Sequence, residues 1–82
     1  MLGAIFRFIF KRQDNIYAIF EVKRRGASLH SAKSQLLSYL IATNAEYGVC
    51  TNMNQSIIFK RTGSHPLYAE VSEFPPIAPV VS

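Results

Sequence analysis

The sequence predicts a small α/β domain with one mixed β-sheet, built in the order β-β-α-β-β with a single crossover helix. Two observations support this fold class. Runs of strand length, rich in aromatic and β-branched residues, occur at 4–10, 16–23, 47–51 and 56–61. Between the second and third runs, the apolar residues change to the three- and four-residue spacing of an amphipathic helix. A helix there connects two strands of one sheet, whereas short turns connect the other neighbours.

The first two strands are predicted from the alternation of their side chains. In residues 4–10, the three phenylalanines fall on one face of the strand, opposite Ile5, Arg7 and Ile9. Residues 11–15 are polar and end in turn-favouring residues, so we expect a hairpin loop of about five residues. Residues 16–23 are almost entirely apolar up to the last three positions, which is typical of a strand buried on both faces.

The helix is predicted to follow Ser28, which suits an N-cap, and to end near Asn44. Its buried face is expected to consist of Leu29, Ala32, Leu36, Leu37, Leu40 and Ile41. The remaining expected elements are strands at 47–51 and 56–61, a turn at 52–55 and a short strand at 67–71. Three prolines near the end indicate an extended tail. We therefore expect a domain at 1–63, followed by a strand and Pro-rich tail or linker at 64–82.

The composition excludes several classes of protein. The chain has 82 residues, 49% of them hydrophobic and only 17% charged, which argues against disorder and leaves room for one core. A single cysteine, Cys50, argues against a disulfide scaffold or a zinc finger. The apolar start is too short to span a membrane, so we expect a soluble cytoplasmic protein. The net charge of +4 is compatible with nucleic acid as a partner.

A Glu-x-Lys motif lies at the end of the most hydrophobic strand. Alternation places Glu21 and Lys23 on one face and Val22 on the other. A carboxylate can hold a hard cation and a neighbouring ammonium can orient the attacking water, which suits metal-assisted phosphodiester hydrolysis. For a bare Glu-x-Lys, however, a strand that reaches the surface and pairs two opposite charges is the simpler explanation.

The surrounding sequence resembles the PD-(D/E)xK nuclease superfamily, and most closely the N-terminal nuclease domain of type I restriction enzyme R subunits. Four features, which together span roughly residues 4–61, carry the resemblance. They are the run Tyr17-Ala18-Ile19-Phe20-Glu21-Val22-Lys23, the loop Arg24-Arg25-Gly26, the helical Gln35-Leu36-Leu37-Ser38-Tyr39, and Tyr47-Gly48-Val49-Cys50-Thr51-Asn52.

This resemblance implies a site and its ligands. Glu21, Lys23 and Gln35 are the implied catalytic residues, and Glu21 with Val22 the implied metal ligands for Mg²⁺. Implied DNA contacts come from Arg24, Arg25, Lys33 and Tyr39. Simpler alternatives remain for these residues. Gln35 would lie on an ordinary helix surface, Tyr39 would be half-buried by packing, and the basic residues would be solvated surface charges. Thr51 and Asn52 are expected to form a turn.

One acid of the family's metal site is missing. The only aspartate, Asp14, precedes Glu21 by seven residues, about 23 Å along a strand. With a five-residue loop, the residue that faces Glu21 is expected near Ile5. Residues 3–4 occupy the region where the family has Pro-Asp, and the preceding family helix is also missing. We therefore expect a shortened relative or a fragment, with catalysis by this chain in doubt.

Three hypotheses follow from the sequence. The first is a DNA endonuclease domain of a type I restriction enzyme R subunit, with DNA and other restriction-modification subunits as partners. The second is a DNA-binding or interaction module that has lost the metal site. The third is an assembly domain that forms a homodimer through the strand of Phe6, Phe8 and Phe10.

Overall fold

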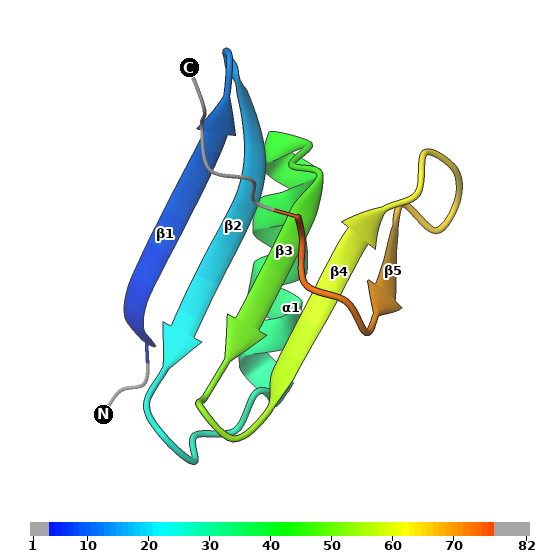
Figure 1. Cartoon of the computed structure of the whole chain (residues 1–82). Helices are drawn as coiled ribbons and strands as arrows, with labels where there is room; N and C mark the ends of the chain where they lie inside the picture. Colours follow the sequence, from blue (N-terminus) through cyan, green and yellow to red (C-terminus); the bar gives the residue numbers. More distant parts are fainter. Residues whose placement is uncertain (1–3, 77–82) are drawn as a thin grey trace.

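A five-stranded sheet carries one helix on one of its faces (Figure 1). The computed structural model describes residues 4–76. Its elements are β1 (Ala4–Arg12), β2 (Asn15–Lys23), α1 (His30–Thr43), β3 (Tyr47–Thr51), β4 (Ser56–Arg61) and β5 (Tyr68–Val71). The strands lie in the order β1-β2-β3-β4-β5, and only the β2–β3 pair is parallel. The predicted fold class, a mixed sheet with one crossover helix between the second and third strands, is confirmed.

The β1–β2 hairpin has a tighter turn than expected. β1 continues to Arg12 and β2 starts at Asn15, so only Gln13 and Asp14 connect them. Gln13 takes a left-handed backbone with φ of 58°, which a two-residue turn of this kind requires. The prediction of a five-residue loop was therefore wrong. The shorter turn moves the pairing register by one residue, and an irregularity between Phe10 and Lys11 moves it by one more. Arg7, not Ile5, faces Glu21 across the hairpin.

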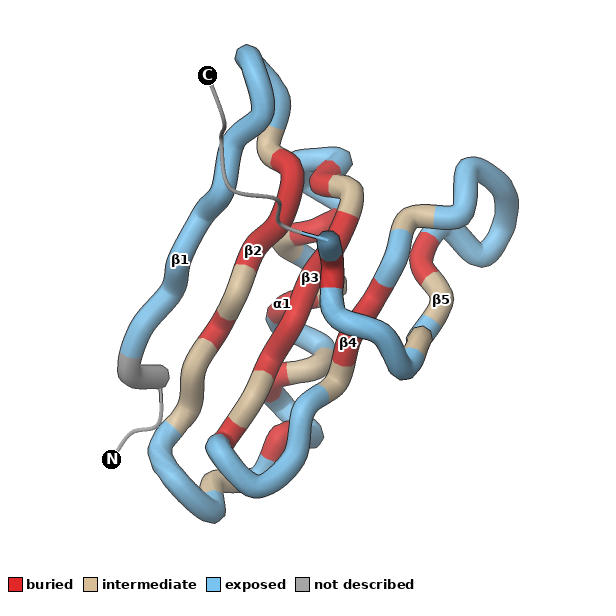
Figure 2. The backbone as a smooth tube through the Cα atoms, viewed as in Figure 1, coloured by how far each residue is buried: buried red, intermediate tan, exposed pale blue. Residues whose placement is uncertain are grey.

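The core lies between α1 and the centre of the sheet, where buried residues cluster (Figure 2). Leu36 and Leu40 of α1 are fully buried, as is Cys50 of β3. Gly48 of β3 faces Leu40 so closely that a Cβ there would lie 2.6 Å from the leucine Cδ1. The absence of a side chain at position 48 is therefore what lets α1 approach β3.

The ends of α1 agree with the prediction to within one residue. Leu29 is the N-cap, and Ser28 Oγ accepts a hydrogen bond from the His30 N–H at 3.2 Å. Asn44 ends the helix in a left-handed conformation, and its N–H donates to the Leu40 carbonyl. Ile41, predicted to be buried, is 59% exposed, because the buried positions follow Ala32, Leu36 and Leu40 along one stripe.

The sheet extends beyond residue 63, since β5 pairs with β4. The buried Tyr68 hydroxyl of β5 lies 2.9 Å from the Leu40 carbonyl oxygen and also contacts that of Ala45. After β5 the chain crosses the sheet face opposite α1, where Tyr17 donates a hydrogen bond to the Pro76 carbonyl (Figure 1). The division of the chain at residue 63 stays a prediction, and residues 77–82 of the predicted tail lie outside the described part.

The predicted face of phenylalanines is confirmed on the edge strand β1. Phe6, Phe8 and Phe10 pair with Val22, Phe20 and Ala18. They stay 58%, 49% and 39% exposed, respectively. Homodimer formation through this strand stays a prediction.

Among residues 4–76, no helix is long and apolar enough to cross a membrane.

Candidate functional site

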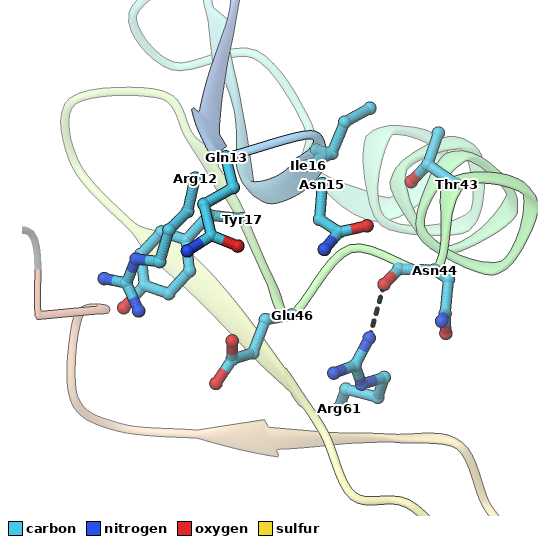
Figure 3. Close-up of a pocket in the computed structure, with 9 residues that line it drawn as sticks. All are labelled: Arg12, Gln13, Asn15, Ile16, Tyr17, Thr43, Asn44, Glu46 and Arg61. Carbon is cyan, nitrogen blue, oxygen red and sulfur yellow. Dashed lines mark hydrogen bonds between the residues drawn. The ribbon is translucent and has the colours of Figure 1, made fainter.

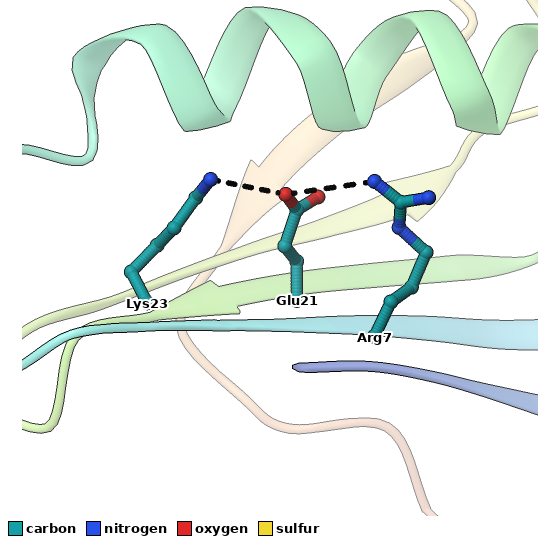
Figure 4. A network of polar contacts seen from close by, with 3 residues as sticks. All are labelled: Arg7, Glu21 and Lys23. Carbon is teal, nitrogen blue, oxygen red and sulfur yellow. Dashed lines mark ion pairs between the residues drawn. The ribbon is translucent and has the colours of Figure 1, made fainter. Parts of the chain in front are cut away.

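Glu21 and Lys23 point from the end of β2 toward α1 (Figure 4). The Glu21 side chain is completely buried, and the Lys23 Nζ lies 3.2 Å from its Oε2. The Lys23 side chain is only 11% exposed. The predicted juxtaposition on one face of the strand is confirmed, and it places an ion pair beneath the helix.

Arg7 completes this group from the neighbouring strand, and sequence reasoning missed it. Its Nη2 lies 3.7 Å from Glu21 Oε2, and its side chain is 38% exposed. The guanidinium also lies over the ring of Tyr39 in α1, 4.1 Å from the ring centroid. A two-residue turn alone would place Phe6 opposite Glu21, and the register shift between Phe10 and Lys11 brings Arg7 to this position instead.

Within residues 4–76, the Glu21 carboxylate is neutralised by its ion pairs and not by hydrogen bonds. Neither of its oxygens accepts a hydrogen bond from the described residues, although both are enclosed. Cys50, its neighbour in β3, responds to this environment. Burial, reinforced by the negative charge of Glu21, raises the pKa of the Cys50 thiol to about 11. The thiol is thus protonated at neutral pH and packs as a small apolar group.

The basic loop after β2 stands at the same end of the sheet. Arg24 and Arg25 are exposed, and neither forms an ion pair within the described part of the chain. Asn52 holds this loop by donating from Nδ2 to the Ala27 carbonyl at 2.6 Å. Its Oδ1 accepts the N–H groups of residues 54 and 55, which confirms that Asn52 shapes a turn.

The other predicted site residues form no ion pair or hydrogen bond with the Glu21 carboxylate within the described part of the chain. Gln35 is exposed on α1, and its side chain makes no hydrogen bond among the described residues. Lys33 pairs with Glu70 of β5 at 3.5 Å. Val22 pairs with Phe6 and Thr51 in the sheet. Glu21 thus contacts Lys23 and Arg7, and Arg7 contacts Tyr39, whereas Gln35 and Lys33 form no polar contact with Glu21 in the described structure.

The residues present do not fit a divalent cation. Within residues 4–76, no three His, Cys, Asp or Glu side chains gather where they could hold a metal ion. The single carboxylate of the site already has two cationic partners, which would repel a third positive charge. Binding of Mg²⁺ by Glu21 and Val22 stays a prediction that this arrangement does not support.

A cavity of about 330 Å³ lies at the opposite end of β2 (Figure 3). Both arginines that line it are already engaged within the domain. Arg61 Nη1 donates to the Asn44 carbonyl at 2.5 Å, and the Arg12 guanidinium lies over the Tyr17 ring. None of the predicted site residues lines it. We therefore place the candidate site at the Glu21 end of the sheet.

Comparisons with known proteins add one family. A family model described as type I restriction enzyme R protein N terminus matches residues 7–75. The match begins at Arg7 and includes the hairpin, the helix and the last strand. No curated protein and no solved structure matches the chain.

Proposed function

Because the chain belongs to the type I restriction enzyme R protein N terminus family, we propose that it is a DNA-binding, nuclease-like domain that contacts the DNA backbone without a bound metal. One observation carries the proposal. The buried Glu21 carboxylate, which the resemblance assigns to a metal, is already neutralised by Lys23 and Arg7. The site thus has an excess of positive charge and suits phosphate better than a cation.

The basic loop supplies the contact surface. Arg24 and Arg25 follow Lys23 directly and are exposed, and no described acid neutralises them. The loop is held in place by Asn52 and by the hydrogen bond from the Ala27 N–H to the Arg24 carbonyl at 2.9 Å. Because the loop backbone is already held, binding need not order it, and arginine guanidinium groups match phosphate geometry. We expect them to make the principal backbone contacts, with DNA and the other restriction-modification subunits as partners.

Fluorescence anisotropy with a labelled DNA duplex, in EDTA and over a series of salt concentrations, tests this proposal. We expect binding that weakens steeply with salt. Arg24→Ala and Arg25→Ala should each lower the slope of log K against log salt by about 1. Lys60→Ala, which removes an exposed lysine from β4 at the other end of β3, is the matched control. Absence of duplex binding, or equal losses in all three variants, would refute the proposal.

Metal-dependent DNA cleavage is a second candidate function, with Glu21, Lys23 and Gln35 as its predicted residues. The observation in its favour is that both Glu21 oxygens lack hydrogen bonds. Incubation of supercoiled plasmid with the protein and Mg²⁺ or Mn²⁺ tests it. Nicking that Glu21→Gln abolishes would select this function, whereas an intact plasmid under conditions of measurable DNA binding would select the first.

A further inference from the structure

Arg7 stands at the position on β1 that faces Glu21. The resemblance to nucleases leads one to expect a second metal-binding acid on this strand, and the structure has a cation there instead. We propose that Arg7 is a built-in counter-cation for Glu21 that keeps divalent cations out of the site. The inference rests on the proposed function, because it explains how a nuclease-like site binds DNA without metal.

Two contacts hold the Arg7 guanidinium in this place. Its Nη2 lies 3.7 Å from Glu21 Oε2, and its Cζ lies 4.1 Å from the centroid of the Tyr39 ring. The Arg7 side chain is partly exposed while that of Glu21 is completely buried. Arg7 therefore stands between solvent and one side of the carboxylate, and Lys23 contacts it from its own strand.

The charges in this group disfavour binding of a divalent cation. Lys23 and Arg7 with Glu21 carry a net charge of plus one, before any ion enters. A divalent ion at Glu21 would have to displace Arg7 and remain beside Lys23. Oxygen ligands are what such ions need, and Arg7 and Lys23 offer none.

An acidic residue at position 7 should allow a divalent cation to bind at Glu21. Side chains that face each other on antiparallel strands have Cβ atoms about 4.5–5.5 Å apart, close enough for two carboxylates to share one cation. Arg7→Asp would therefore place a second carboxylate beside Glu21 and remove the competing guanidinium. Lys23 would stay in place, as in the natural protein.

Electron paramagnetic resonance of Mn²⁺ tests the proposal without DNA, because bound Mn²⁺ loses the sharp spectrum of the free ion. We expect the natural protein to leave the spectrum unchanged and Arg7→Asp to bind one Mn²⁺. The double variant Arg7→Asp, Glu21→Gln should lose that binding. Lys11→Asp makes the same charge change on the same strand, opposite Ile16, and should bind no Mn²⁺.

Binding of Mn²⁺ by the natural protein, or no binding by a folded Arg7→Asp variant, would overturn the proposal. Far-UV circular dichroism shows whether that variant folds. If it does not, Arg7→Asn supplies a neutral oxygen at the same position. Mn²⁺ must then raise its thermal midpoint but not that of the natural protein, and no rise would overturn the proposal. If the Mn²⁺ results are as expected but the natural protein does not bind DNA, only the proposed function is rejected, and the role of Arg7 stands.

Discussion

Lys23→Ala should destabilise the domain more than Arg7→Ala does. Both substitutions remove one cationic partner of Glu21, so they differ mainly in the distance and exposure of the charge removed. Lys23 Nζ lies 3.2 Å from the carboxylate and its side chain is 11% exposed, whereas Arg7 lies at 3.7 Å and is 38% exposed. The structure therefore ranks the two ion pairs before any measurement.

The expected magnitudes follow from Coulomb's law and solvent screening. At an effective dielectric constant of about 20, unit charges at these two distances attract by roughly 5 and 4 kcal/mol. Breaking a buried pair typically costs about 3–5 kcal/mol, and an exposed pair contributes about 1 kcal/mol or less. We expect a loss of about 3 kcal/mol for Lys23→Ala, because Arg7 still balances part of the charge. Partial exposure reduces the loss for Arg7→Ala to about 1–2 kcal/mol, including its contact with Tyr39.

Urea unfolding followed by circular dichroism measures both losses. With a slope of about 1 kcal/mol/M for a domain of this size, the midpoint should fall by about 3 M for Lys23→Ala and 1–2 M for Arg7→Ala. Lys11→Ala, an exposed residue of β1 outside any described ion pair, should change the free energy of unfolding by no more than about 0.5 kcal/mol. Equal losses in all three variants, or a larger loss for Arg7→Ala than for Lys23→Ala, would contradict this ranking of the two ion pairs.

Three further predictions concern the core. Gly48→Ala should cost about 1–3 kcal/mol in urea unfolding, because the new methyl group would lie 2.6 Å from Leu40 Cδ1, and the fully buried Leu40 side chain would have to shift. Cys50 should react with iodoacetamide near neutral pH only after unfolding, as mass spectrometry would show, since the thiol is buried and its pKa is raised to about 11. Burial also raises the pKa of Tyr68, so the folded state holds both protons more tightly than the unfolded chain does. The urea midpoint should therefore be constant below about pH 9 and fall as the pH rises toward 11, and a midpoint that rises there would contradict both shifts.

Local patterns in the sequence were sufficient to predict the elements and half of the candidate site. Apolar alternation identified the strands, and the spacing of Leu36 and Leu40 identified the buried stripe of α1. The two-residue period of a strand also placed Glu21 and Lys23 on one face. These features depend only on neighbours along the chain.

The pairing partner of Glu21 could not be predicted in the same way. It depends on the length of the hairpin turn and on the register shift between Phe10 and Lys11. The polar residues Lys11 and Arg12, which were predicted as loop, extend β1 instead. Their side chains are exposed, so burial did not decide their conformation. A total shift of two residues keeps the side chains of residues 6–10 on their predicted faces, yet it moves Arg7 to the position that faces Glu21.

The role of Tyr39 also depended on tertiary structure. The resemblance implied that Tyr39 contacts DNA, but the ring lies against the Arg7 guanidinium. Only the packing of α1 across the β1–β2 hairpin brings these two residues together. DNA contact by Tyr39 stays a prediction.

One titration tests directly whether the domain binds DNA without a metal ion. Fluorescence anisotropy would compare the affinity of the natural protein for a DNA duplex in EDTA and in millimolar Mg²⁺ at matched ionic strength. We predict equal or slightly weaker binding with Mg²⁺, since Lys23 and Arg7 already neutralise Glu21. Markedly tighter DNA binding with Mg²⁺, lost in the Glu21→Gln variant, would contradict metal-free DNA binding.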